Sequence, residues 1–171
     1  SNQEAEDVDP ALPAANTAFA VKLFQELNAA ELAAGDDGDK TNLFVSPLSI
    51  STALSMVYQG ATGETRTAIA QALEVQGIDP VVLNGAWKSL IHSLENVDDD
   101  VILAIADSVW MDDAFAPAVK QDFLDAVIEY FDSEVYTEDF GDPATLETIN
   151  GWVEDHTNGK IQDLLDQIPT D

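Results

Sequence analysis

The chain has 171 residues, 46% of them hydrophobic, which is enough to bury a core, and it contains no cysteine, which excludes disulfides and thiolate chemistry. Its 33 acidic residues against 6 basic ones leave a net charge of −27, and this excludes nucleic acid and anionic membrane surfaces as partners, because both require clustered lysine or arginine. The acidic residues recur along the whole chain, so we interpret them as the solvated surface of a halophilic protein whose self-repulsion is screened by counterions. Capture of a basic partner is the alternative.

The first predicted element is a helix that follows an acidic leader. Residues 1–12 are predicted to form this flexible leader, and residues 13–171 are predicted to form the N-terminal part of a single domain. Apolar residues spaced about four apart then place one stripe on a helix over residues 16–33.

A short strand and an unusual helix come next. The apolar segment 42–45 predicts the strand, and Ser46 and Pro47 supply the side-chain cap and the fixed backbone angle that begin a helix. Residues 48–58 carry apolar side chains on all sides of that helix with small hydroxyl residues between them, so we expect it to run through the core.

Two further helices and a buried strand are predicted in the middle of the chain. The helices cover residues 63–73 and a segment that begins at Asp79 and buries Trp87 among leucine and isoleucine residues. Residues 101–111 are too short and too β-branched for a helix interior, and they predict a strand buried on both faces.

The last third of the chain predicts a helix, an edge strand and a second helix. The helix covers residues 117–131, the strand covers residues 133–140, and the second helix starts at Asp142. Asn158 and Gly159 then turn the chain before a short helical piece over residues 161–168.

These elements indicate a mostly helical α+β fold with too few strands. A strand that is buried on both faces needs neighbours, and the other predicted strands are too short and too far apart to supply them. The chain is therefore either half of a domain or a partner of another chain.

Two long segments resemble the serpin family of serine protease inhibitors. NLFVSPLSISTALSMVYQGATGETRTAIAQAL, residues 42–73, is similar to the stretch that leads from a short strand into that family's central helix. INGWVEDHTNGKIQDLL, residues 149–165, is similar to the end of the helix that crosses its main sheet. The residues between them follow the family's order of strand, helix and edge strand, so the resemblance runs from about residue 14 to the end and implies the N-terminal, mostly helical half of the serpin fold.

One residue departs from the pattern of the family. The buried strand carries Asp107 where serpins usually have asparagine. A carboxylate inside a buried strand costs several kcal/mol unless it is paired or protonated, so we expect a local difference from the family at this position.

The resemblance implies a suicide inhibitor of serine or cysteine endopeptidases, in a protein about twice as long as this chain. In such an inhibitor the protease cleaves a reactive loop near the C-terminus, forms an acyl-enzyme, and is carried across the main sheet as the loop inserts. That loop and the strands that receive it are expected in the missing C-terminal half, so the chain alone is expected to be inactive. Its expected partners are that half and a target serine protease. A non-inhibitory carrier or chaperone serpin, or a module that assembles through its open sheet edge, is the alternative.

The resemblance also assigns candidate site residues near the start of the central helix. Ser46, Pro47 and Ser49 correspond to the serpin shutter, a hydrogen-bonded cluster beneath the point where the main sheet opens. The alternative, which the residue types alone also allow, is that Ser46 is only a helix cap and Ser49 only a small packing residue.

A second group of candidates belongs to the sheet-crossing helix and the turn after it. These residues are Asn150, Trp152, Thr157, Gly159 and Lys160. We favour packing and a turn for them over partner binding, because an inward tryptophan followed by Asn-Gly is typical of a helix end.

No catalytic residue, metal site or cofactor is predicted, so we expect the protein not to be an enzyme. His92 and His156 lie far apart in sequence, without a second ligand at metal spacing, and no common catalytic motif is present. Heparin is not expected to bind, because residues 80–95 carry few basic side chains. We expect an extracellular location, with the cytoplasm as the alternative.

Overall fold

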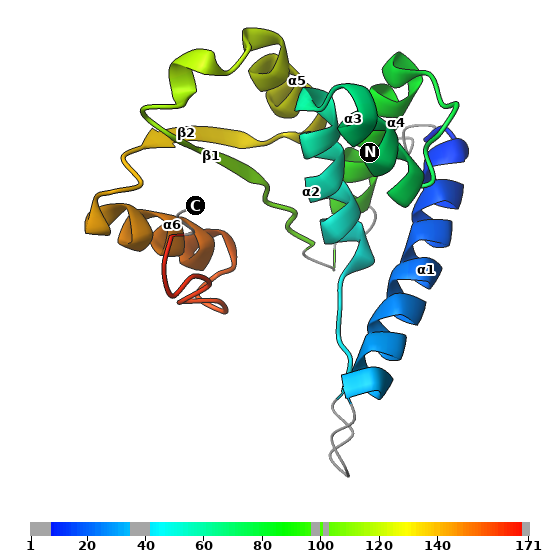
Figure 1. The fold of residues 1–171 in the computed structure, drawn as a ribbon, viewed down its shortest axis with the longest axis horizontal. Coiled ribbons are helices and arrows are strands. Elements are labelled where there is room, and N and C mark those ends of the chain that lie inside the picture. The colour runs from blue at the N-terminus through cyan, green and yellow to red at the C-terminus, as the bar shows by residue number, and fades with distance from the viewer. Residues whose placement is uncertain (1–7, 35–41, 97–99, 101–102, 169–171) are drawn as a thin grey trace. The chain divides into compact units, whose positions relative to one another are not determined.

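The computed structural model describes residues 8–34, 42–96, 100 and 103–168 (Figure 1). These residues divide into two compact units, one that ends at Leu90 and one that begins at Ile91. Within the described residues, no helix combines the length and the apolar content that a membrane crossing requires.

Four helices contribute to the first unit. They are α1 (Ala11–Ala34), α2 (Pro47–Gly60), α3 (Gly63–Ala72) and the greater part of α4 (Pro80–Glu95). Leu12, Leu73, Leu83 and Trp87 are almost fully buried, so the core is built from the first turns of α1, the end of α3 and the inner side of α4. The predicted helices over residues 63–73 and from Asp79 onward are confirmed.

The first helix starts earlier than its apolar stripe predicts. Asp9 accepts a hydrogen bond from the backbone N–H of Ala11 at 2.9 Å, and this capping contact begins α1. Leu12 is 0% exposed, so the predicted leader over residues 1–12 is too long. Residues 1–7 of that leader lie outside the described residues.

α2 buries its hydroxyl-bearing side. Ser51 and Thr52 both donate hydrogen bonds to the carbonyl of Leu48 at 2.9 Å, so their hydroxyls are satisfied inside the helix and tolerate burial. Met56 and Tyr58 are buried as well, whereas Ile50 is 36% exposed and Val57 is 54% exposed. The prediction that this helix runs through the core is therefore confirmed for one side of the helix only.

The second unit contains two strands and two helices besides the end of α4. The elements are β1 (Ser108–Asp112), the short 3-10 helix η1 (Ala116–Ala118), α5 (Gln121–Phe131), β2 (Glu134–Glu138) and α6 (Pro143–His156). The strands lie side by side and parallel, with Ser108 opposite Glu134 and Asp112 opposite Glu138 (Figure 1). Such a pair needs a crossover connection, which α5 provides. Val127 and Phe131 are the buried residues of α5.

The predicted strand over residues 101–111 is shorter and more exposed than expected. β1 begins only at Ser108, Leu103 is 41% exposed, and Met111 alone is buried within the strand. Residues 101–102 lie outside the described residues. The described sheet has two strands, so β1 has one partner and is not buried on both faces.

Four other predicted elements differ in detail. The helix over residues 117–131 divides into η1 and α5, and the edge strand over residues 133–140 is confirmed as β2 with narrower bounds. Residues 161–168 bend without forming the predicted helical piece, and residues 42–45 are extended without a strand partner among the described residues.

Candidate functional site

Ser46 and Ser49 come together at the start of α2. The Ser46 hydroxyl accepts a hydrogen bond from the backbone N–H of Ser49 at 3.3 Å, and the two hydroxyl oxygens lie 2.8 Å apart. Pro47 occupies the first turn of the helix, where its missing N–H carries no penalty. Both serines are exposed in this chain, so a role in a shutter stays a prediction.

Asn150 and Thr157 fold the segment after α6 back onto that helix. The side-chain amide of Asn150 donates to the Leu165 carbonyl and accepts from the Leu165 N–H, both at 2.9 Å. The Thr157 hydroxyl donates to Val153 at 2.8 Å and accepts from the N–H of Ile161 at 3.1 Å. These contacts hold the 161–165 segment in its bent form.

Gly159 and Lys160 follow in the turn that ends α6. Asn158 and Gly159 have φ values of +53° and +73°, which is the left-handed conformation that ends helices. The backbone N–H of Gly159 donates to the carbonyl of Glu154 at 2.8 Å, and Lys160 is exposed. We interpret both residues as parts of the turn.

Trp152 belongs to a cluster that joins α6 to the sheet. This Glu134 cluster consists of Trp110 from β1, Glu134 and Tyr136 from β2, and Trp152 and His156 from α6. The Trp110 ring stacks on Tyr136 with centroids 4.3 Å apart and meets the edge of Trp152 at 6.4 Å. Trp152 in turn stacks on His156 at 4.1 Å. Four rings therefore form a continuous series from β2 to the last turn of α6.

The carboxylate of Glu134 lies at the centre of this cluster. It accepts hydrogen bonds from the Tyr136 hydroxyl and from the Trp152 indole N–H, the latter at 2.9 Å, and it contacts Nε2 of His156 at 3.2 Å. The Tyr136 hydrogen bond, followed by that of Trp152, lowers the pKa of Glu134 below its usual value. The same bond to Glu134 raises the pKa of Tyr136.

Sequence reasoning missed Glu134, Trp110 and Tyr136 as a site. Glu134 and Tyr136 are two residues apart on a strand, which places them on one face, and Trp152 and His156 are four apart on a helix, which does the same. These two local spacings were available in the sequence. Their meeting across 18 residues of chain was not, because it depends on how α6 docks on the sheet.

Asp107 lies just before β1. One oxygen of its carboxylate is buried and has no hydrogen-bond partner among the described residues. Burial raises the pKa of Asp107 from 3.8 to about 6. The residue is held in place through its backbone, since its carbonyl accepts from the N–H of Glu134 at 3.0 Å.

Replacing this carboxylate by an amide, Asp107→Asn, is expected to stabilise the chain by about 1–2 kcal/mol at pH 7, less than the full shift because the residue is partly exposed. The folded-state pKa of about 6 lies above the ordinary value of 3.8, so the folded state holds the extra proton and stability rises as the pH falls from 6 to 4. The variant should lack that rise.

Urea unfolding at pH 4, 5, 6 and 7 measures both effects, and Asp163→Asn at an exposed position is the control. Equal stability of Asp107→Asn and the unaltered chain at pH 7 would contradict this assignment.

A group of three carboxylates lies at the other end of the strands. Single oxygens of Asp112, Asp113 and Asp139 lie within 4.8 Å of one another. Asp112 accepts hydrogen bonds from the backbone N–H groups of Ala114 at 3.0 Å and Phe140 at 3.1 Å. These bonds give the group a role in the turns that follow β1 and β2.

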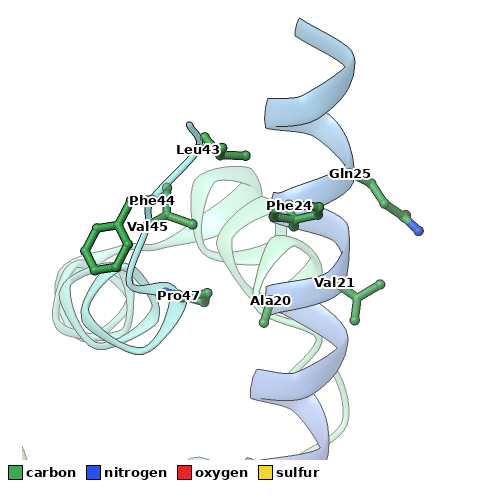
Figure 2. A pocket seen from close by; sticks show the side chains of 8 residues that line it. All are labelled: Ala20, Val21, Phe24, Gln25, Leu43, Phe44, Val45 and Pro47. Carbon is green, nitrogen blue, oxygen red and sulfur yellow. The ribbon is translucent and has the colours of Figure 1, made fainter. Parts of the chain in front are cut away.

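An apolar groove of about 630 Å³ lies between α1 and the extended segment 43–47. Its lining residues are Ala20, Val21, Phe24, Gln25, Leu43, Phe44, Val45 and Pro47. Figure 2 shows Leu43 and Pro47 on the side of the segment that faces α1, whereas the Phe44 ring points away from it. Phe44 is 96% exposed.

The backbone beside this groove is also open. Among the described residues, none forms a hydrogen bond with the N–H or carbonyl groups of Leu43, Phe44 or Val45. An extended segment with free backbone groups and apolar side chains has the properties of an unpaired edge strand.

Comparison with known proteins gives one family. The family model described as serpin (serine protease inhibitor) matches residues 14–171. The chain is 34% identical to the leukocyte elastase inhibitor of Bos taurus over 156 residues, which are 90% of the chain and 38% of the relative. It is 31% identical to the thyroxine-binding globulin of Rattus norvegicus over 160 residues, which are 92% of the chain and 36% of the relative.

Solved structures give the same result. The chain is similar to the thermophilic serpin tengpin in its latent state, with a TM-score of 0.79, 28% identity, and coverage of 97% of this chain and 42% of that one. The chain thus spans between 36% and 42% of the length of these three proteins. Matches of this extent in sequence and in fold show that the chain belongs to the serpin family.

Proposed function

We propose that this chain is the N-terminal part of a serpin that inhibits a serine or cysteine endopeptidase. In the proposed reaction the protease cleaves a reactive loop outside these residues and forms an acyl-enzyme, and the loop then enters the main sheet as a new strand. The observation that carries the proposal is the free edge of β1, which has β2 as its partner on one edge only among the described residues. Further strands of the main sheet would join at this open edge, and those strands, expected in the missing C-terminal half, would receive the loop.

Two sets of described residues have roles in this proposal. Ser46 and Ser49 would form part of the shutter, because their hydroxyls bond to each other and stay exposed to strands that would cover the start of α2. α6 would have to yield and return as the sheet opens, so the Glu134 cluster would hold it in the resting position. This is a strain-release transition of the kind that loop insertion drives.

The groove and the open side of α2 would receive the rest of the fold. We propose that an apolar strand from the C-terminal half pairs with Leu43–Val45, covers Phe44 and fills the groove beside α1. Free backbone groups favour a strand as the occupant over a helix, because a strand satisfies them by direct pairing. Coverage of 36% to 42% of the related chains supports this source for the occupant.

A non-inhibitory serpin is the second candidate. The similarity to a protein named thyroxine-binding globulin favours it, since a carrier of that name shares the same part of the fold. Under either candidate the protein is not an enzyme and uses no cofactor. We also propose a halophilic, extracellular setting, with molar salt as the working condition for the −27 charge.

The full-length protein should form a covalent complex with a protease. The full-length protein is incubated with a panel of salt-tolerant serine and cysteine proteases in about 2 M KCl, where its surface charges are screened. The products are then separated by denaturing electrophoresis. We expect a band at the summed mass of inhibitor and protease that survives denaturant, and none with the 171-residue chain alone. Cleavage of the full-length protein by every protease without such a band would contradict inhibition and favour the carrier.

A further inference from the structure

Both ring nitrogens of His156 face hydrogen-bond acceptors. Nδ1 lies 2.8 Å from the backbone carbonyl oxygen of Trp152, and Nε2 lies 3.2 Å from a carboxylate oxygen of Glu134. A carbonyl oxygen has no proton to donate, and neither has an ionised carboxylate. Each of the two contacts is therefore a hydrogen bond only if the histidine nitrogen that makes it carries a proton.

A neutral imidazole cannot meet this requirement. It carries one N–H and one bare nitrogen, so one of the two contacts would set a lone pair against another lone pair. Only the imidazolium form donates from both nitrogens at once. The last turn of α6 also favours a cation, because its carbonyl groups point toward that end of the helix.

We propose that Glu134, Trp152 and His156 form a proton-dependent clasp that holds α6 on the β1–β2 sheet while His156 is charged. The carboxylate of Glu134 joins the helix to the strand at two points one helical turn apart, the Trp152 indole and the His156 ring. When His156 loses its proton, the second point is lost and the indole hydrogen bond remains. The clasp thus has a tight state and a loose state.

The groups around His156 leave Glu134 as its partner. On the same face of the sheet, β2 adds Tyr136 and then Glu138, and β1 adds Trp110 and Asp112. Along its own chain Asp155 precedes His156 and Lys160 follows the helix. Among the described residues, Glu134 is the acid with which His156 forms an ion pair.

The clasp is expected to be tight within a window of pH. On the acidic side it opens as Glu134 becomes protonated, and the lowered pKa of Glu134 puts this loss below the ordinary value of 4.5. On the alkaline side it opens when the imidazolium loses its proton, because the neutral ring cannot donate from both nitrogens. The groups are 33% and 47% exposed, so salt weakens the ion pair and leaves the matched hydrogen bonds.

The clasp has a consequence if α6 moves during inhibition, and this consequence rests on the function proposed above. Mild acid would then slow the displacement of α6 and with it the insertion of the loop. The clasp itself requires no protease and is tested without one.

Hydrogen exchange of the α6 backbone amides tests the clasp in the 171-residue chain. The experiment uses about 1 M KCl, at which the Debye length is about 3 Å and surface charges are screened. Protection, corrected for the chemical exchange rate at each pH, should fall by about two- to fivefold between pH 5.5 and 8. The variants are made in an Asp107→Asn parent, so that the raised pKa of Asp107 does not contribute to the pH dependence, and in this parent His156→Gln should remove the fall, because glutamine does not titrate. Glu134→Gln should remove or reverse it, because its amide N–H₂ suits the neutral imidazole.

His92→Gln is the matched control, since His92 is the other histidine of the chain and is exposed on α4. This variant should keep the fall of the Asp107→Asn parent. Protection of α6 that does not change with pH in the Asp107→Asn parent, or that changes equally in this parent and in its His156→Gln variant, would overturn the clasp. Neither outcome depends on whether the full-length protein inhibits a protease.

Discussion

Phe44→Ala is expected to leave the 171-residue chain as stable as before and to cost the full-length protein about 3–5 kcal/mol. In this chain the Phe44 side chain is 96% exposed, so its removal leaves no cavity. In the full-length protein we propose that the side chain is covered by a strand that pairs with Leu43–Val45. The same substitution therefore reports whether that surface is covered.

The matched control is Phe19→Ala, because Phe19 is 6% exposed and belongs to the core of the chain itself. It should destabilise both proteins by about the same amount. Unfolding in urea at constant molar salt gives all four differences. A full-length protein that tolerates Phe44→Ala as well as the shorter chain does would contradict the proposed cover.

Raising KCl from 0.1 M to 2 M is expected to increase the melting temperature by about 10 °C or more, since it relieves repulsion on every surface. The chain has 33 acidic and 6 basic residues, and ion pairs join Lys22 to Glu74 and His156 to Glu134. Repulsion between the acidic side chains is therefore almost unopposed at low salt.

Thermal unfolding followed by circular dichroism measures this dependence. A variant with Glu64→Gln, Glu129→Gln and Glu147→Gln is the control, because these three exposed acids are removed without a change of fold. Its melting temperature should rise less with KCl than that of the unaltered chain. A melting temperature that stays flat between 0.1 M and 2 M would defeat the interpretation of the charge as adaptation to salt.

The helices of this protein were largely predictable because their signals are local. The spacing of Leu83, Trp87 and Ile91 predicts one buried side of α4, and all three are buried. Asp142 accepts a hydrogen bond from the N–H of Ala144 at 2.9 Å, as expected of a residue that starts a helix. Such features depend on neighbours within four residues.

Burial was less predictable because it depends on what covers a surface. α2 carries apolar residues all round, and this pattern predicts that they are buried. The pattern does not predict which segment of the protein buries them. In this chain its hydroxyl side packs inward, while Ile50 and Val57 stay open. The strand over residues 101–111 failed for the same reason, since its second neighbour is not among the described residues.

The contacts of the candidate site also differ in how far the local sequence predicts them. The contact between Ser46 and Ser49 follows from a serine-proline pair at a helix start, and sequence reasoning found it. The hydrogen bond between Glu134 and Trp152 joins a strand to a helix 18 residues later in the chain, and no local sequence pattern predicts it. Asp107 lies between these cases, because the resemblance to serpins singled out the position and the structure shows that its carboxylate is partly buried.

The most direct test of the account is hydrogen exchange at the backbone amides of Leu43, Phe44 and Val45. In the 171-residue chain these amides have no hydrogen-bond partner among the described residues and should exchange at nearly the rate of an unstructured peptide. In the full-length protein they should be protected by about a hundredfold or more, as expected for amides paired in a sheet. Equally fast exchange in both proteins would contradict the claim that this chain supplies an edge strand and an apolar surface that the rest of a serpin covers.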